Sequence, residues 1–274
     1  MLKDKSGPSA RRRYDANYEN FRSQLYSSIR RQAYGEDIGQ NSWLTADEHD
    51  KFLEWLELST GKRLLDVACG AGGPAMRAAE KHHCTVVGID LHEKAIAAAN
   101  DAVTQRGLER VVTFRQGNVG ESIPFPDGYF DAIICIDAIN HIPERPLVFS
   151  EWARLLKPSG RVLFTDPVTV TGALTDSELK IRSSGGFYLF VPEGYDERLL
   201  AEHGLRLLRK ENVTRNMAEI AEGRWKARDA RKNELREVEG PEGFAEQQEF
   251  LATAAKIASE NRLSRFVFLS EKCS

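Results

Sequence analysis

The segment at residues 64–75 constrains the fold more than any other, because it joins an apolar strand to a glycine-rich turn and a helix. Its sequence is Leu-Leu-Asp-Val-Ala-Cys-Gly-Ala-Gly-Gly-Pro-Ala. Glycines at such a turn let the backbone and a ligand approach each other closely. The spacing of Gly70, Gly72 and Ala75 also satisfies the dinucleotide fingerprint, so the turn by itself would equally admit NAD. The flanking residues must decide which ligand it serves.

Around this turn, short apolar runs alternate with amphipathic helices. The predicted strands are residues 63–68, 85–89, 111–115, 133–136 and 161–165, and the predicted helices are residues 75–83, 93–106 and 147–156. This alternation implies parallel strands joined by right-handed crossovers, with helices on both faces of the sheet. The sequence therefore predicts a doubly wound α/β core.

The two ends of the chain depart from this rhythm. Residues 14–58 are predicted to be helical, with an interruption at residues 35–39 and a new helix after the N-cap candidate Thr45, which has Glu48 at capping-box spacing. A helix at 192–203 and strands at 205–213 and 262–270 follow the core. Residues 216–259 are predicted to form two helices broken at Gly240-Pro241. We therefore expect a helical cover (1–60), a core (61–215), a helical lid (216–260) and a last core strand (261–274).

Composition excludes several classes of protein. With 274 residues and 41% hydrophobic content, the chain can bury a full core. A net charge of −3 provides no positive field for a nucleic acid, so none is expected as a partner.

No apolar stretch approaches the roughly 20 residues of a membrane span, and a cytoplasmic protein is expected. The cysteines lack paired CxxC spacing, so neither a metal site nor a disulfide framework is expected; they are Cys69, Cys84, Cys135 and Cys273. The oligomeric state stays open, a homo-oligomer included.

Polar residues at the predicted strand ends indicate the ligand. Asp66 precedes the glycines, where a carboxylate suits a cationic amine better than a pyrophosphate, which favours an amino-acid-bearing cofactor. Asp90 ends the second strand, where its two oxygens can accept hydrogen bonds from both hydroxyls of a ribose. Asn118 follows the third strand and can accept from the exocyclic amine of adenine.

These segments resemble motif I and the following motifs of class I S-adenosylmethionine-dependent methyltransferases. The matching segments are residues 64–75, residues 123–131, the fourth strand ending in Asp137, and residues 156–164, all in the order of the family. Residues 137–143 and the helical N-terminus are similar to the ubiquinone/menaquinone-type and sarcosine/dimethylglycine-type small-molecule methyltransferases. The resemblance implies a Rossmann-like seven-stranded sheet whose last strand runs antiparallel.

The resemblance also implies a role for each matching residue toward S-adenosylmethionine, whose product is S-adenosylhomocysteine. The methionine end would be lined by Asp66, Ala68, Gly70 and Gly72, the ribose and adenine by Asp90 and Leu91, the adenine by Asn118 and Val119, and the sulfonium end by Asp137. The sequence departs from the commonest pattern twice, since Ala68 replaces a frequent glycine and Asn118 replaces a frequent aspartate.

His141 follows the fourth strand and is the single candidate for a catalytic base, because an imidazole with a pKa near 6.5 can take a proton from a hydroxyl or ammonium acceptor. A loop histidine bonded to the backbone is an equally weighted alternative. Gln40 and Trp43 lie in a polar break between the N-terminal helices that folds over the cofactor in related enzymes, although hydrophobic docking is favoured for Trp43.

Candidates for the acceptor pocket are aromatic, with core packing as the alternative for each: Tyr14, Tyr18, Phe187, Tyr188 and Trp225. The expected function is transfer of a methyl group to an O, N or C nucleophile of a small metabolite, which requires no metal. One alternative is an NAD-dependent oxidoreductase, which explains neither Asp66 nor residues 156–160. The other is a non-catalytic partner protein that only binds S-adenosylmethionine.

Overall fold

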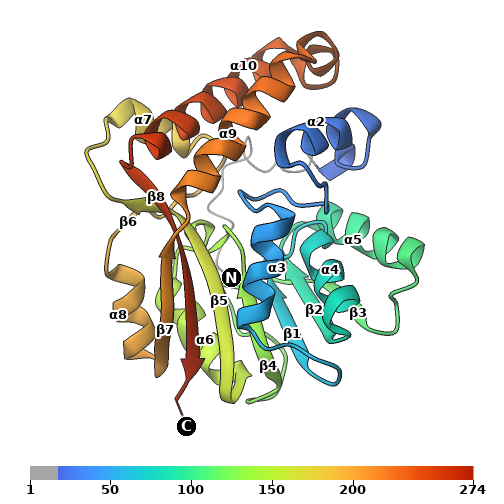
Figure 1. Ribbon diagram of the computed structural model, residues 1–274, viewed down its shortest axis with the longest axis vertical. Coiled ribbons are helices and arrows are strands. Elements are labelled where there is room, and N and C mark those ends of the chain that lie inside the picture. Colours follow the sequence, from blue (N-terminus) through green and yellow to red (C-terminus); the bar gives the residue numbers. More distant parts are fainter. Residues whose placement is uncertain (1–17, 274) are drawn as a thin grey trace.

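A computed structural model describes residues 18–273 and shows one mixed sheet at the centre of the molecule (Figure 1). The strand order is β3-β2-β1-β4-β5-β8-β7. The strands are β1 (Arg63–Val67), β2 (Thr85–Asp90), β3 (Val112–Gln116), β4 (Phe130–Cys135), β5 (Leu156–Val170), β7 (Leu205–Asn212) and β8 (Leu263–Lys272). Strands β1 to β5 run parallel, and β8 runs antiparallel to both of its neighbours. The predicted seven-stranded sheet with an antiparallel last strand is confirmed, and a short strand that the sequence did not indicate, β6 (Val191–Pro192), pairs with β5.

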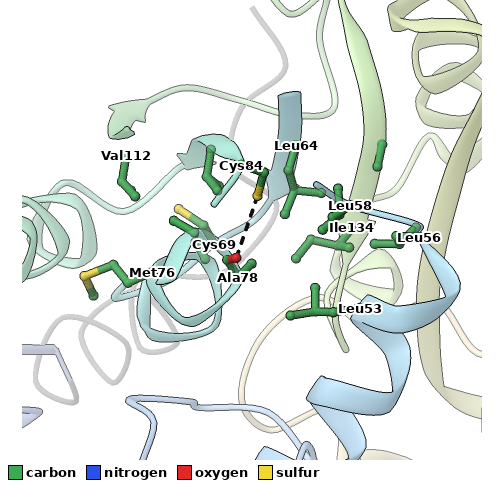
Figure 2. Close-up of a cluster of buried hydrophobic side chains, with 14 of the residues drawn as sticks. Leu53, Leu56, Leu58, Leu64, Cys69, Met76, Ala78, Cys84, Val112 and Ile134 are labelled. Carbon is green, nitrogen blue, oxygen red and sulfur yellow. Dashed lines mark hydrogen bonds between the residues drawn. The ribbon is translucent and has the colours of Figure 1, made fainter. Parts of the chain in front are cut away.

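Helices cover both faces of this sheet, as the alternating pattern requires. One face packs against α3 (Ala46–Trp55), α4 (Gly73–His82) and α5 (Glu93–Arg106), and the other against α6 (Arg145–Leu155) and α8 (Tyr195–Glu202). Figure 2 shows part of the first of these two apolar clusters, where the thiol of Cys84 donates to the carbonyl of Ala78 at 3.7 Å. The two clusters fix the strand ends that carry the polar residues.

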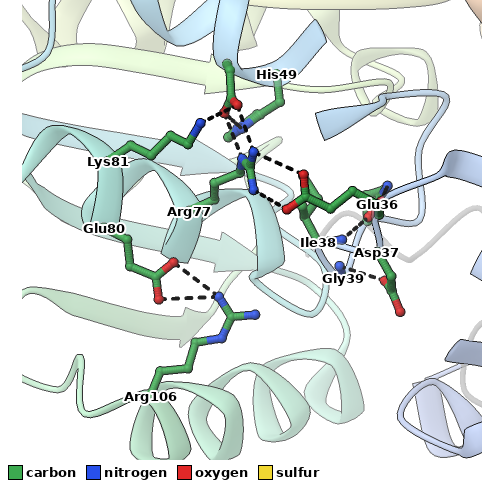
Figure 3. Close-up of polar contacts among 11 residues, drawn as sticks. Glu36, Asp37, Ile38, Gly39, His49, Arg77, Glu80, Lys81 and Arg106 are labelled. Atoms are coloured by element: carbon green, nitrogen blue, oxygen red, sulfur yellow. Dashed lines mark hydrogen bonds and ion pairs between the residues drawn. The ribbon is translucent and has the colours of Figure 1, made fainter. Parts of the chain in front are cut away.

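The segment before β1 crosses the start of α4 at very close range. A Cβ at Gly73 would lie 1.9 Å from the carbonyl oxygen of Ile38, so only glycine allows this crossing. The segment is also held by charge, because Arg77 of α4 donates to Asp50 and to Glu36, each at 2.7 Å (Figure 3). The N-terminal segment is thereby docked beside the glycine-rich turn.

The predicted helix after Thr45 is confirmed, but half of its capping box is used differently. The hydroxyl of Thr45 accepts from the backbone N–H of Glu48 at 3.2 Å. The Glu48 carboxylate does not return to the cap. Instead it accepts from Arg265 of β8 at 2.7 Å, because a buried arginine there needs anionic partners.

Two helical features were not predicted from the sequence. The predicted break at Gly240-Pro241 is confirmed, because Gly240 has non-helical backbone angles (φ 77°, ψ 159°) that divide the span called α10 (Lys232–Ser259) into two helical parts. A further break at residues 230–231 separates this span from α9 (Thr214–Asp229). The helix α9 packs on α2 (Gln24–Tyr34) and on α10. The helix α7 (Asp176–Arg182) was not predicted, although Thr175 and Glu178 form a complete capping box at its start.

The helices α2, α7, α9 and α10 gather beyond one end of the strands, above the labels of β1 and β5 (Figure 1). Aromatic and aliphatic side chains join them: Trp43 stacks on Phe250 of α10 with ring centres 6.4 Å apart, and both belong to a cluster with Met217 and Ile220 of α9. Among the helices of residues 18–273, none combines the length and apolarity needed to cross a bilayer.

Candidate functional site

A cavity of about 360 Å³ lies where the order of the parallel strands reverses, between the carboxyl ends of β1 and β4. Open α/β sheets bind ligands at this reversal point. Its walls come from the glycine-rich turn, the segment at residues 39–43, the loops after β2, β3 and β4, and the helices α7, α9 and α10. The predicted residues among its lining are Tyr18, Gln40, Trp43, Asp66, Ala68, Gly70, Asp90, Leu91, Asn118, Val119, Asp137, His141, Phe187 and Tyr188.

Two carboxylates form an acidic end of this cavity. Asp66 is 4% exposed, and its carboxyl group makes no hydrogen bond to the described part of the chain. Burial and the nearby charge of Asp90 raise the pKa of Asp66 well above its usual range. Asp90 accepts from the backbone N–H groups of Gly70 at 2.8 Å and of His92 at 2.9 Å, one on each carboxylate oxygen. Each oxygen keeps a further lone pair for a ligand.

The turn between the carboxylates and α4 has the backbone conformation that glycine favours. Gly70 and Gly72 have φ values of 55° and 76°, and Ala68 adopts a φ of 59°, a conformation that glycine adopts with less strain than alanine. A Cβ at Gly70 would lie 3.0 Å from the hydroxyl of Tyr18. A Cβ at Gly72 would lie 2.3 Å from the ring of Phe114. Gly72 is thus packed beneath the turn and does not line the cavity.

The loop after β3 is closed by Asn118. Its side-chain oxygen accepts from the N–H of Gly120, and its amide donates to Glu121, both at 3.0 Å. Val119 is buried and Leu91 is 44% exposed, so one is in the wall and the other at the rim. These three residues form the side of the cavity beyond Asp90.

The N-terminal segment is tied to the core through Asp137, which follows β4. One oxygen of Asp137 accepts from the N–H of Trp43 at 2.8 Å, and the other accepts from Thr165 and from the buried Arg265, both at 2.7 Å. The amide of Gln40 folds back on its own segment, accepting from the N–H of Ile38 at 2.8 Å. The side chains of Asp137 and Gln40 therefore hold the cavity wall in place, and Trp43 both docks on α10 and lines the cavity.

His141 lies in the short helix η1 (Ile139–His141) with its ring 4.5 Å from that of Tyr188. Its Nδ1 is 3.0 Å from the carbonyl oxygen of Phe187, which can only accept, so Nδ1 carries the proton in the neutral ring. Burial lowers the pKa of His141 to about 4, opposed by the hydrogen bond to that carbonyl. The imidazole is neutral at physiological pH, with Nε2 as its proton acceptor.

One of the acceptor candidates is not brought to the cavity, and another cannot be placed. Trp225 is 37% exposed and lines a separate surface groove between α9 and α10, so its assignment to the acceptor pocket was wrong. The structure turns it outward because the inner face of α9 is occupied by its neighbours Ala221 and Met217 in the cluster with α10. Tyr14 lies outside the described residues.

Sequence reasoning missed several polar residues of the lining, among them Asn140, Arg182 and Arg224. Asn140 is 1% exposed, and in the described chain neither its side-chain oxygen nor its nitrogen has a hydrogen-bond partner. Arg182 of α7 and Arg224 of α9 also line the cavity. Asn140 stands directly before His141 in a motif that was noticed, but no sequence signal indicated the two arginines.

The two carboxylates at the acidic end fit S-adenosylmethionine better than they fit a dinucleotide. A buried carboxylate at Asp66 would be repelled by a pyrophosphate, whereas an α-ammonium group would neutralise it. The strand-end carboxylate of Asp90 keeps lone pairs for two hydroxyls. The cavity therefore accommodates an amino acid joined to a nucleoside.

Comparisons with known proteins agree with this geometry. Residues 58–204 match a family described as a methyltransferase domain. The 27-O-demethylrifamycin SV methyltransferase of Amycolatopsis mediterranei is 31% identical over 202 residues, which cover 69% of this chain and 74% of that protein.

Solved structures share the fold. A protein assigned as a sarcosine dimethylglycine methyltransferase of Galdieria sulphuraria has a TM-score of 0.80 at 22% identity, covering 95% of this chain and 98% of that one. Phosphoethanolamine N-methyltransferase 2 of Haemonchus contortus, in complex with phosphomonomethylethanolamine and S-adenosylhomocysteine, has a TM-score of 0.80 at 22% identity, covering 96% of this chain and 60% of that one.

The chain belongs to the methyltransferase domain family, and it is an S-adenosylmethionine-dependent methyltransferase that acts on small molecules. The sequence-based choice of cofactor is confirmed over the nicotinamide alternative. The acceptor and the assignment of each residue belong to the proposals that follow.

Proposed function

We propose that this enzyme methylates a hydroxyl or amine nucleophile of a small molecule and that His141 removes the proton of that nucleophile. The observation that carries the proposal is the hydrogen bond between His141 Nδ1 and the carbonyl of Phe187, which leaves Nε2 as the proton acceptor in a ring lining the cavity. A pKa of about 4 keeps the base neutral at the pH of the cell.

The cofactor occupies the acidic end in this proposal. Asp66 accepts from its α-ammonium, Asp90 accepts from both ribose hydroxyls, and Asn118 and Val119 lie against the adenine. S-adenosylmethionine supplies a methyl group already activated by its sulfonium. The task of the protein is then to orient the acceptor, exclude water and take one proton.

Residues 1–60 and 216–260 act in this scheme as a cover and a lid over the core at 61–215 and the last strand at 261–274. The stacking of Trp43 on Phe250 supports the arrangement, because it joins the N-terminal segment to α10 directly across the cavity wall. Asn140 orients the acceptor, since a buried amide without a partner gains most from a polar ligand.

The test compares His141→Gln with His203→Gln. His203 is a matched control, because its Nδ1 also lies near a backbone carbonyl, that of Leu199 at 2.8 Å, but it is not among the cavity-lining residues. Formation of S-adenosylhomocysteine is measured over a panel of small alcohols, phenols and amines. With the best acceptor, His141→Gln is expected to lower kcat about 100- to 10,000-fold, which is the usual contribution of a general base to the rate.

Binding of S-adenosylhomocysteine by His141→Gln should stay at the wild-type value. The wild-type kcat/KM should also remain free of a histidine-like fall near pH 6.5, since the base titrates near 4. Equal turnover by both variants would show that His141 is not the base. Positioning of the acceptor beside the cofactor would then be the source of the rate enhancement.

A further inference from the structure

A buried arginine lies behind the cavity wall at the start of α6. Arg145 is fully buried, and its guanidinium donates to the carboxylates of Asp166 in β5 at 2.6 Å and of Asp196 in α8 at 2.8 Å. It makes a third hydrogen bond, of 3.2 Å, to the backbone carbonyl of Leu189. Its chain neighbour Glu144 lines the cavity, but Arg145 and its two carboxylates do not. This ionic cluster can therefore act on the reaction only through other residues.

The bond to Leu189 reaches a segment that contacts the helix η1 at several points. The N–H of Leu189 donates to the carbonyl of Asn140 at 2.8 Å. The carbonyl of Phe187 lies 3.0 Å from Nδ1 of His141. Between them, the ring of Tyr188 meets the His141 ring edge-on, with the ring centres 4.5 Å apart. Residues 187–189 thus contact both polar residues of η1 that line the cavity.

Residues 187–190 belong to no helix or strand, so no ladder of backbone hydrogen bonds holds them. Burial would lower the pKa of Arg145, but the charges of Asp166 and Asp196 raise it, so the donor to the segment is a cation. A charged donor binds a carbonyl more tightly than a neutral donor does. Because loss of hydration offsets the attraction within a buried ionic cluster, its net stabilisation is small. The geometry that it imposes on residues 187–189 explains the cluster better.

We propose that Arg145 is a positioning residue for methyl transfer: it fixes residues 187–189, and through the carbonyl of Phe187 it sets the tautomer and the orientation of His141. Asp166 and Asp196 hold the guanidinium in place. This inference rests on the proposed function, because the ring that is oriented is the proposed base. Without the hold on the segment, the imidazole populates both neutral tautomers. In the tautomer that carries its proton on Nε2, this nitrogen can no longer accept a proton from the acceptor.

The first test compares Arg145→Lys with Arg154→Lys. Lysine keeps the charge but not the planar fork of donors that serves two carboxylates and a carbonyl together. Arg154 of the same helix is a matched control, since it also binds two carboxylates and two backbone carbonyls, none of them in the cavity wall: Glu151, Asp127, Ile123 and Phe125.

A second variant keeps the test decisive if Arg145→Lys does not fold. It combines Arg145→Met with Asp166→Asn and Asp196→Asn, so that no buried charge is left without a partner. Replacing a whole buried ionic cluster by neutral side chains is often neutral or stabilising. This triple variant should fold, yet it lacks the donor to the carbonyl of Leu189.

The direct readout is the protonation of the His141 ring, followed by nitrogen-15 NMR of histidine-labelled protein in complex with S-adenosylhomocysteine. The signals of His141 are assigned by their absence in His141→Gln. Wild type and Arg154→Lys should show the proton on Nδ1 at pH 7. Arg145→Lys and the triple variant should show both tautomers, and their kcat with the best acceptor should fall about tenfold or more. Their affinity for S-adenosylhomocysteine should stay at the wild-type value.

A wild-type tautomer and a wild-type kcat in the triple variant would overturn the proposal, as would an equal loss in Arg154→Lys. Failure of this inference is distinguishable from failure of the proposed base. Loss of turnover in His141→Gln, with an unchanged tautomer in both Arg145 variants, refutes the positioning role alone. A changed tautomer in the Arg145 variants, with full turnover in His141→Gln, refutes the base while the hold on the ring stands.

Discussion

Replacing Arg265 by methionine tests how the cover is held to the core. Arg265 is fully buried in β8 and pairs with Asp137 and Glu48, both at 2.7 Å. Its pKa is raised because the two carboxylates outweigh the burial that would lower it. Burial also raises the pKa of Glu48, against the effect of Arg265, so the carboxylates depend on this one cation.

Breaking a buried ion pair from one side costs about 3–5 kcal/mol, because a charge is left without compensation. For a chain of this size that corresponds to a fall in Tm of about 6–20 °C. Because Asp137 also accepts from the N–H of Trp43, the variant should bind S-adenosylhomocysteine more weakly as well. Thermal and urea unfolding followed by circular dichroism, and calorimetric titration, measure the two effects.

The control is Arg215→Met, which removes an exposed ion pair with Glu219 and should cost no more than about 1 kcal/mol. Adding Glu48→Gln and Asp137→Asn to Arg265→Met should recover part of the lost stability, because the stranded charges are then gone. If Arg265→Met unfolds no earlier than Arg215→Met, the network does not hold the cover and the reasoning fails.

Two further predictions concern packing and pH. Gly72→Ala should lower the free energy of unfolding by about 2 kcal/mol or more, since the new Cβ meets the Phe114 ring at 2.3 Å and the φ of 76° is strained for alanine. Gly107→Ala is the control, because its φ of 66° is similar but a Cβ there meets open space, so it should cost only the free energy of the strained backbone conformation. Equal losses of stability in urea unfolding would refute the packing argument. Burial beside another carboxylate raises the pKa of Asp196 to about 8 despite Arg145, so its stabilising effect is present at low pH and is lost as the pH rises through 8. Wild-type stability should then fall by up to about 1.4 kcal/mol per pH unit between about pH 4, where the unfolded carboxyl group ionises, and about pH 8, and this contribution should level off above pH 8. Asp196→Asn should abolish that fall; an unchanged slope between about pH 4 and 8 in the variant would contradict the reasoning.

The acidic end of the site could be read from the sequence because its residues are local to the strand ends. Asp90 ends β2 and Asp66 lies one residue before the end of β1, and the carboxyl ends of parallel strands meet at one edge of the sheet. The glycine pattern is also local, since it encodes positive φ values at Gly70 and Gly72. Local pattern and topology rules therefore suffice for this half of the cavity.

The opposite side could not be predicted in the same way. Arg224 and Trp225 are adjacent in sequence, yet the first lines the cavity and the second lies on the outer surface. Successive residues of a helix are turned by about 100°, and a polar helix such as α9 has no clear apolar stripe to show which side faces inward. The rotation of α9 is set by its packing against α2 and α10.

The sequence by itself determined the doubly wound core, the places of its strands along the chain and the carboxylates near their ends, because strand and helix periodicity and turn chemistry act over a few neighbouring residues. The tertiary structure decided what depends on distant segments meeting. It placed Ile38 against Gly73, gave Glu48 and Asp137 a shared buried arginine, and enclosed Arg182 among three aromatic rings. These contacts join residues that are far apart in the chain, and packing geometry, which no local pattern encodes, selects them.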